Sequence, residues 1–156
     1  MILHFFEDLA IVNGWLKKLL LLHFDDVKYH FPIELITHKR VDGLECDLIV
    51  KSSRGIKILC ELKVDDVFKA LDQVIARRKY FKYCYVVMEN SIHWILKMIS
   101  SQIDRILYNG IGIISSLDNA IIIKSYSNRH VHYEVEGYGF IKKLSSYFSK
   151  ECESNG

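Results

Sequence analysis

Apolar residues recur along the chain at two spacings, one typical of helices and the other typical of strands. The helical spacing predicts helices over residues 2–22, 66–81, 92–108 and, at the end of the chain, about 138–148. Alternation and short apolar runs predict strands over residues 27–36, 44–50, 56–64, 83–88, 111–115 and 120–124. The polar stretch 38–43 separates two of these strands and is typical of a turn.

The predicted elements follow the order α-β-β-β-α-β-α-β-β-α. Consecutive strands followed by a strand–helix–strand unit predict an α/β protein, with a mixed central sheet flanked by helices. The strand at 83–88 is apolar on both faces, which indicates a central position in the sheet. We expect a single domain over residues 1–149, because the chain has the usual length of one domain, and a flexible polar tail over 150–156.

Composition narrows the class of protein. Half of the residues are apolar and 26% are charged, as in ordinary soluble globular proteins. No apolar run is long enough to span a bilayer, so we expect no membrane partner. The four cysteines form no Cys-x-x-Cys pair, which argues against a zinc knuckle and favours a reducing, cytoplasmic setting. A net charge of +2 neither demands nor excludes a nucleic-acid partner.

The third predicted strand carries an unusual pair of charges. Glu61 and Lys63 lie two residues apart on an otherwise apolar strand, so they share one face. Asp47 lies in the preceding strand, and a hairpin can place it beside Glu61. Two neighbouring carboxylates repel each other unless a cation lies between them, and oxygen ligands of this kind suit Mg²⁺ or Mn²⁺. Lys63 would assist the attacking water or neutralise charge on a phosphate.

The helix predicted after this strand carries a polar stripe. Five residues spaced three or four apart lie opposite its apolar face: Asp66, Lys69, Gln73, Arg77 and Tyr80. The stripe begins just after Lys63. Amide, cationic and aromatic side chains in such a row would suit a phosphate backbone.

Asp47 in one strand, followed fourteen residues later by Glu61-Leu62-Lys63 in the next, resembles the PD-(D/E)XK nuclease superfamily. This superfamily includes restriction endonucleases and archaeal Holliday-junction resolvases. The resemblance covers about residues 2–90 and implies a restriction-endonuclease-like αβββαβ core. It also implies that Asp47 and Glu61 are metal ligands, that the backbone carbonyl of Leu62 is a third ligand, and that Lys63 is the catalytic lysine.

Further positions follow from the same resemblance. Many members carry an acidic residue on the first helix, for which Glu7 is the best match and Asp8 its competitor. Some carry a glutamine on the helix after Glu-x-Lys, which matches Gln73 as a catalytic residue. Tyr80 lies farther from Gln73 than the usual Gln-x-x-x-Tyr spacing. Asp42 competes with Asp47 for the first aspartate, but an apolar strand directly follows Asp47.

We therefore expect an Mg²⁺-dependent endo- or exodeoxyribonuclease, with Mn²⁺ as a substitute metal and RNA not excluded as a substrate. The residues expected to contact nucleic acid are Lys39, Arg40, Lys69, Arg77, Arg78 and Tyr80. The alternative is a catalytically inactive nuclease-fold protein that binds nucleic acid or a partner subunit. A plain surface ion-pair cluster of Asp47, Glu61 and Lys63 also remains open. A homodimer through the exposed part of the helix 92–107 is a third possibility, compatible with either of the others, because enzymes of this superfamily that cut both strands commonly pair two sites.

Overall fold

The structure is a computed structural model that describes residues 1–4, 14–24, 26–41, 43–63 and 66–127, with only the backbone described for Leu44 and Lys63. Its strands are β1 Ile2–Leu3, β2 Ile33–Val41, β3 Leu44–Lys51, β4 Lys57–Lys63, β5 Tyr83–Met88, β6 Ile111–Ser115 and β7 Ala120–Ile123. Its helices are α1 Gly14–His23, α2 Val67–Arg77, α3 Ile92–Ile99 and α4 Ile103–Tyr108. Three short 3-10 helices are η2 Val27–His30, η3 Arg78–Tyr80 and η4 Ser100–Gln102.

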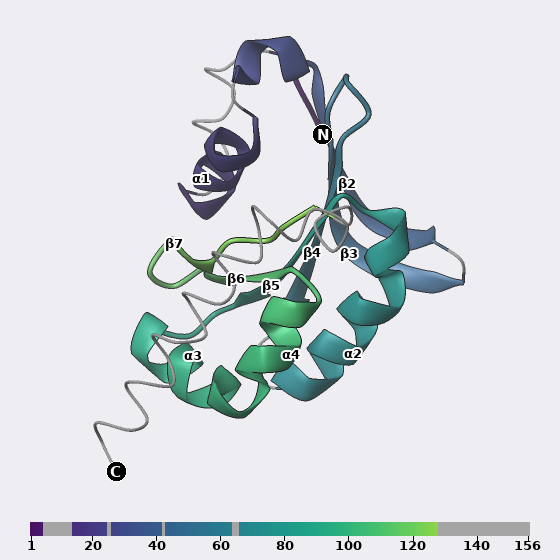
Figure 1. Cartoon of the computed structure of the whole chain (residues 1–156). Helices are drawn as coiled ribbons and strands as arrows, with labels where there is room; N and C mark the ends of the chain where they lie inside the picture. Colours follow the sequence, from purple (N-terminus) through teal and green to yellow (C-terminus); the bar gives the residue numbers. More distant parts are fainter. Residues whose placement is uncertain (5–13, 25, 42, 64–65, 128–156) are drawn as a thin grey trace.

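The described strands form one seven-stranded sheet in sequence order (Figure 1). The pairs β1–β2, β2–β3 and β3–β4 are antiparallel, the pairs β4–β5 and β5–β6 are parallel, and β7 is antiparallel to β6. Each parallel pair requires a crossover, which α2 provides between β4 and β5 and α3–α4 provides between β5 and β6. The prediction of an α/β protein with a mixed sheet is therefore confirmed.

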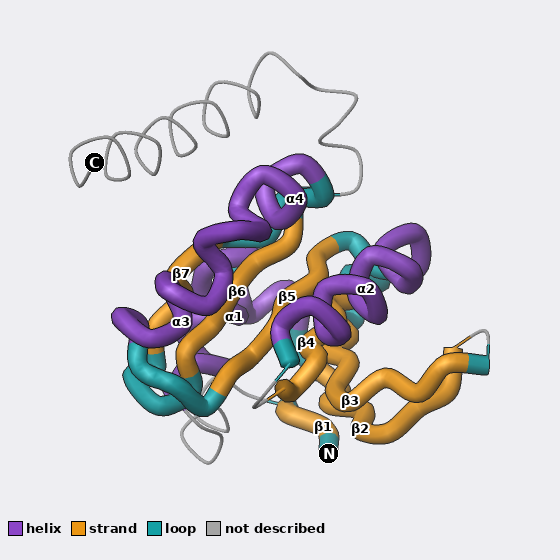
Figure 2. The backbone as a smooth tube through the Cα atoms, turned by 90° about the horizontal axis from the view of Figure 1, so that it is seen from below, coloured by secondary structure: helices purple, strands orange, loops and turns teal. Residues whose placement is uncertain are grey.

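The helices cover both faces of the sheet. Figure 2 shows α2, α3 and α4 on one face and α1 on the other. One buried cluster joins α2, α3 and α4 to side chains such as Leu59 and Val86. A second cluster joins α1 to side chains such as Ile58 and Val87. Alternate residues of β4 and β5 therefore enter different clusters, as expected for a sheet buried on both sides.

Side-chain hydrogen bonds cap the first turns of two helices, and a glycine allows one strand to lie close to a buried ring. Asp66 accepts a hydrogen bond from the Lys69 N–H and so caps α2. Ser91 caps α3 in the same way through the Trp94 N–H. Gly112 allows β6 to lie directly against the Tyr85 ring, because a Cβ atom there would meet a ring carbon at 2.2 Å.

Several predicted boundaries were wrong. Residues 2–3 form a strand and not the start of the first helix, and the described part of that helix is Gly14–His23. Residues 27–30 form a 3-10 helix and not a strand. Strand β2 continues to Val41, through most of the stretch expected to be a turn. The helix expected over 92–108 is interrupted by η4.

The predicted last helix and the polar tail lie outside the described residues. Among the helices that are described, none has the length and the apolar character needed to cross a membrane.

Candidate active site

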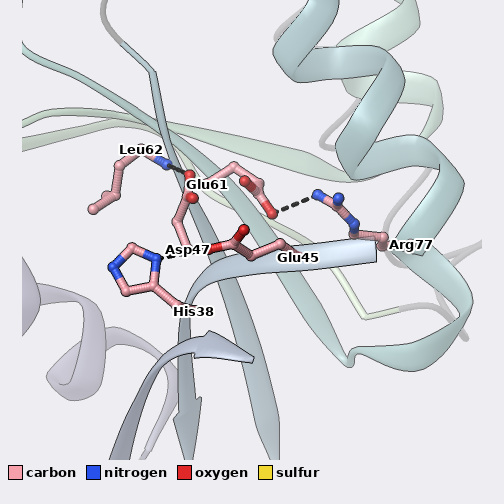
Figure 3. A network of polar contacts seen from close by, with 6 residues as sticks. All are labelled: His38, Glu45, Asp47, Glu61, Leu62 and Arg77. Carbon is pink, nitrogen blue, oxygen red and sulfur yellow. Dashed lines mark hydrogen bonds and ion pairs between the residues drawn. The ribbon is translucent and has the colours of Figure 1, made fainter. Parts of the chain in front are cut away.

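The candidate site lies where β3 and β4 separate. Their pairing runs from Lys51–Lys57 to Leu48–Cys60, and one further step would place Asp47 opposite Glu61. A second step would pair Leu62 with Cys46, but the Leu62 N–H instead donates to Oδ2 of Asp47 at 2.9 Å. The Asp47 carboxylate thus replaces a main-chain acceptor, and a fork opens between the two strands (Figure 3).

An irregularity in the backbone accompanies this fork. His38 faces Asp47 in the register of β2 with β3, and its φ of 54° is uncommon for a residue other than glycine. Cys46 and Ile49 both enter the cluster under α2, although they lie three residues apart on one strand. The alternation of side chains along β3 is therefore reset between them, at Asp47.

Glu61 forms a buried ion pair with Arg77 of α2. Arg77 Nη1 donates to Oε1 of Glu61 at 2.7 Å, and the two residues are 1% and 4% exposed. Glu61 lies on the same face of β4 as Leu59, as the strand phase predicted. A buried carboxylate needs a positive partner, and Arg77 is that partner in this structure.

Two polar atoms of α2 lie buried without a hydrogen-bond partner in the described part of the chain. They are Oε1 of Gln73 and Nε of Arg77, one helical turn apart on α2. Leaving such atoms unpaired costs about 1–3 kcal/mol each, so native proteins usually satisfy them with water or a ligand. On α2, therefore, one acceptor, Gln73 Oε1, and one donor, Arg77 Nε, lack a hydrogen-bond partner among the described residues.

The residue types at the fork fit a hard cation. Asp47 and Glu61 supply carboxylate oxygens, and the unpaired Gln73 amide oxygen is of the same class. Because the N–H and C=O of one strand residue point toward the same neighbour, the Leu62 carbonyl faces the side of β3 as well. The residues that the structure describes contain no group of three or more His, Cys, Asp or Glu side chains placed to hold a metal. A metal would draw on these oxygens only if Asp47 turned from Leu62 and Glu61 from Arg77.

The two carboxylates reach different partners. Figure 3 shows Glu61 extending toward Arg77, while Asp47 lies against the backbone of Leu62. Asp47 also borders a cavity of about 630 Å³ on the α1 face, whose walls include Trp15 and Leu62. The pairing of β3 with β4 therefore ends one step before these two residues, and their carboxylates are not directed at one point.

Other predicted site residues are placed as follows. The Lys63 backbone pairs with Met88 of β5, at the same end of β4 as Glu61. Lys39, Arg40 and Lys69 are exposed. Glu7, Asp8 and Asp42 lie outside the described residues.

Two of the residues expected to bind nucleic acid have other roles. Arg77 is buried against Glu61 and presents no guanidinium to a ligand at the surface. The guanidinium of Arg78 donates to three backbone carbonyls, those of Asn109, Lys82 and Tyr126. It thereby ties the end of α4 to the chain that follows β7. Tyr80 remains 37% exposed beside them.

A buried polar network on the α1 face had no sequence signal. Tyr85 is fully buried, and its hydroxyl contacts Nε2 of His23 at 2.5 Å and the Ser125 N–H at 3.1 Å. The two partners lie 62 and 40 residues from Tyr85 in sequence. Neither spacing nor periodicity could have paired them. The ion pair of Glu61 with Arg77 was missed for a similar reason, since a strand residue and a helix residue share no local period.

The described cysteines take no nucleophilic role at neutral pH. Cys46, Cys60 and Cys84 are buried free thiols. Burial raises the pKa of Cys60, and it raises the pKa of Cys84 to about 11. Because the thiolate is the reactive form, a raised pKa makes these thiols poor nucleophiles.

Comparison with known proteins finds no match for this chain, whether among models of protein families, curated proteins or solved structures. The site is therefore interpreted from its own residues.

Proposed function

We propose that the chain is a metal-dependent nuclease that hydrolyses phosphodiester bonds of DNA at the fork between β3 and β4. The observation that carries this proposal is the fork itself, where Asp47 and Glu61 each lie one residue beyond the last strand pair, Leu48–Cys60, and the Asp47 carboxylate accepts the Leu62 N–H. The order α1-β2-β3-β4-α2-β5, with β5 parallel to β4, agrees with the order expected of a restriction-endonuclease-like core.

In this proposal Asp47 and Glu61 hold Mg²⁺ or Mn²⁺ together with the carbonyl of Leu62. The bound ion would stabilise negative charge on the scissile phosphate and lower the pKa of a water molecule. Lys63 follows Glu61 by two residues on β4, so it is assigned to orient that water. The Gln73 amide oxygen would accept a hydrogen bond from the water or from the substrate, which would satisfy its buried acceptor.

A second candidate function is binding without cleavage. The observation that favours it is the buried ion pair of Glu61 with Arg77. Arg77 already neutralises the Glu61 carboxylate. Its guanidinium therefore takes the role that a bound metal ion would have. In this alternative the chain binds nucleic acid or a partner subunit and needs no metal.

Cleavage assays with Asp47→Asn separate the two. An asparagine oxygen can still accept the Leu62 N–H, so the substitution removes the charge and keeps the fork. The matched control is Asp104→Asn, because Asp104 is an exposed carboxylate on α4. The substrates are single-stranded, duplex and branched DNA with Mg²⁺ or Mn²⁺.

We expect wild type and Asp104→Asn to cleave at least one substrate, and Asp47→Asn to be slower by on the order of a hundredfold or more. Wild type that cleaves none of them, or that matches Asp47→Asn on all of them, would reject the nuclease and leave the binding protein.

A further inference from the structure

A group of cations lies at the end of the sheet opposite the fork. Lys57 begins β4, whereas Glu61 and Lys63 lie near its end. Lys51 is the cross-strand partner of Lys57 on β3, and the Lys82 N–H donates to the Lys57 carbonyl at 3.0 Å. Three lysines thus follow one another across neighbouring segments of backbone, and all three are exposed.

The turn between β3 and β4 extends this group. The Arg54 Nε donates to the carbonyl of Tyr29 at 3.2 Å, and the guanidinium carbon lies 5.4 Å from the centre of the Tyr29 ring. Tyr29 is 63% exposed. A cation and an open aromatic ring therefore lie beside the lysines.

The end of α1 joins the group to a fifth cation. His23 stacks on Tyr83, and the Lys82 ammonium lies 5.7 Å from the centre of the Tyr83 ring. Lys124 follows directly on β7, whose last residue, Ile123, pairs with Ile113 of β6, and its charge, after burial, is the next cause that lowers the pKa of His23 to about 3. We name the basic end surface by its members: Lys51, Arg54, Lys57, Lys82 and Lys124, with Tyr29 and Tyr83.

The positive charge of this surface is only partly offset. Glu34 stands opposite Lys51, and Asp26 lies at the start of η2 before Tyr29. None of the five cations forms an ion pair with an acidic side chain among the described residues. Like charges directly opposite each other, as in Lys51 and Lys57, destabilise a sheet. A bound polyanion would relieve that repulsion.

The side chains of the basic end surface indicate which kind of polyanion it would bind. Lysine and arginine side chains in a row neutralise successive phosphates, and an exposed tyrosine provides a face on which a base can stack. We propose that the basic end surface binds single-stranded nucleic acid, with phosphates on Arg54, Lys57 and Lys82 and a base on Tyr29. This assignment extends the proposed function, because it names the surface that holds the substrate. Only the link between this surface and cleavage rests on the proposed function.

Binding in EDTA tests the surface without cleavage. The probe is a fluorescein-labelled single-stranded oligonucleotide followed by anisotropy over a range of salt concentrations, with the full chain. The test variants are Lys57→Gln/Lys82→Gln and Tyr29→Ala. The matched control is Lys97→Gln, because the Lys97 ammonium lies 5.8 Å from the Trp94 ring, as Lys82 does from Tyr83, but on α3.

We expect wild type and Lys97→Gln to bind alike. The double variant should bind about tenfold more weakly and lower the slope of log K against log salt by about 2, one unit for each phosphate that a lysine no longer neutralises. Tyr29→Ala should weaken binding about tenfold, because the base has no ring to stack on. A double variant that binds as wild type does, or a wild type that binds anionic lipid vesicles or an acidic peptide but no oligonucleotide, overturns the assignment. Asp47→Asn should bind normally in EDTA, so a failed nuclease and a failed binding surface are distinguishable.

Discussion

Glu61 and Arg77 show how one ion pair bears on both stability and function. Both charges are buried, so each has lost its hydration and depends on the other. Removing one partner leaves the other as an uncompensated buried charge, which costs more than the pair itself contributes. The same dependence means that a cation at Glu61 must compete with Arg77.

Arg77→Met should therefore lower the free energy of unfolding by about 3–5 kcal/mol, because it removes the guanidinium that neutralises the buried Glu61 carboxylate. Urea unfolding at neutral pH measures this change. The control is Arg105→Met, since Arg105 pairs with Asp72 at the surface, where an ion pair contributes about 0–1 kcal/mol. If the two variants lost the same stability, the pair of Glu61 with Arg77 would not be buried in solution.

The proton positions around Tyr85 can be assigned from its partners. The Ser125 N–H donates to the Tyr85 hydroxyl oxygen, and Nε2 of His23 is the second hydrogen-bond partner of that hydroxyl. A neutral imidazole can accept the hydroxyl proton through Nε2. This agrees with the lowered pKa of His23, about 3, caused mainly by burial.

Acid should destabilise the fold through His23. In the unfolded chain His23 takes up a proton near its ordinary pKa of 6.5, whereas in the folded chain it stays neutral down to about 3. The stabilisation is therefore complete above pH 6.5 and is lost as the pH falls from 6.5 toward 3. Between pH 7 and 5 the loss should be about 2 kcal/mol. Urea unfolding at the two pH values should show it in wild type and in His93→Gln, an exposed control, but not in His23→Gln. An equal pH dependence in all three would contradict this assignment.

At the scale of elements, the pattern of apolar residues predicted the buried strands and helices correctly, but it failed for segments whose side chains are exposed. The strands β3 to β6 and the helix α2 were predicted within a few residues, because each buries a continuous row of apolar side chains. The end of β2 was mistaken for a turn. Residues 37–40 are all exposed there, so no alternation marks the strand.

The candidate site also has a part that the sequence pattern predicted and a part that it could not predict. The phase of β4 correctly placed Glu61 on the face of Leu59, because that phase follows from alternation alone. The partner of Glu61 could not be predicted, since Arg77 reaches it across the helix–sheet interface. The turning of Asp47 toward Leu62 depends on the irregular backbone at His38, which no residue pattern announces.

The close packing of β6 against β5 predicts that a methyl group added at Gly112 lowers the stability of the fold. Gly112→Ala would place a Cβ atom 2.2 Å and 2.4 Å from two carbons of the Tyr85 ring. The ring is fully buried and held by His23 and Ser125, so it cannot move away cheaply. We expect the free energy of unfolding, measured by urea, to fall by about 1–3 kcal/mol. Gly14→Ala is the control, because its nearest atom belongs to the Asn119 side chain at 3.3 Å. Equal stability of the two variants would mean that β6 does not lie against Tyr85.

At the scale of the whole molecule, β4 connects the two proposed regions. Lys57 stands at its start on the basic end surface, and Lys63 stands at its end beside the fork. Six residues of extended chain separate them, which corresponds to about 20 Å. A nucleic acid that reaches both regions must therefore span about six nucleotides at the spacing of a B-form strand.

Cleavage should for this reason depend on substrate length. For wild type, kcat/KM should rise about tenfold as single-stranded substrates grow from about four to about thirty nucleotides, because only longer ones reach the basic end surface. The variant Lys57→Gln/Lys82→Gln should cleave the shortest substrate as wild type does, and should lack the rise with length, through KM and not through kcat. The control Lys97→Gln should keep the rise.

If the double variant instead lost activity equally at every length, the lysines would act on the fork itself, and the two ends of β4 would not be separate regions. A rise that persists in the double variant would place the distal binding surface elsewhere, for which the exposed Lys39 and Lys69 are the next positions to replace.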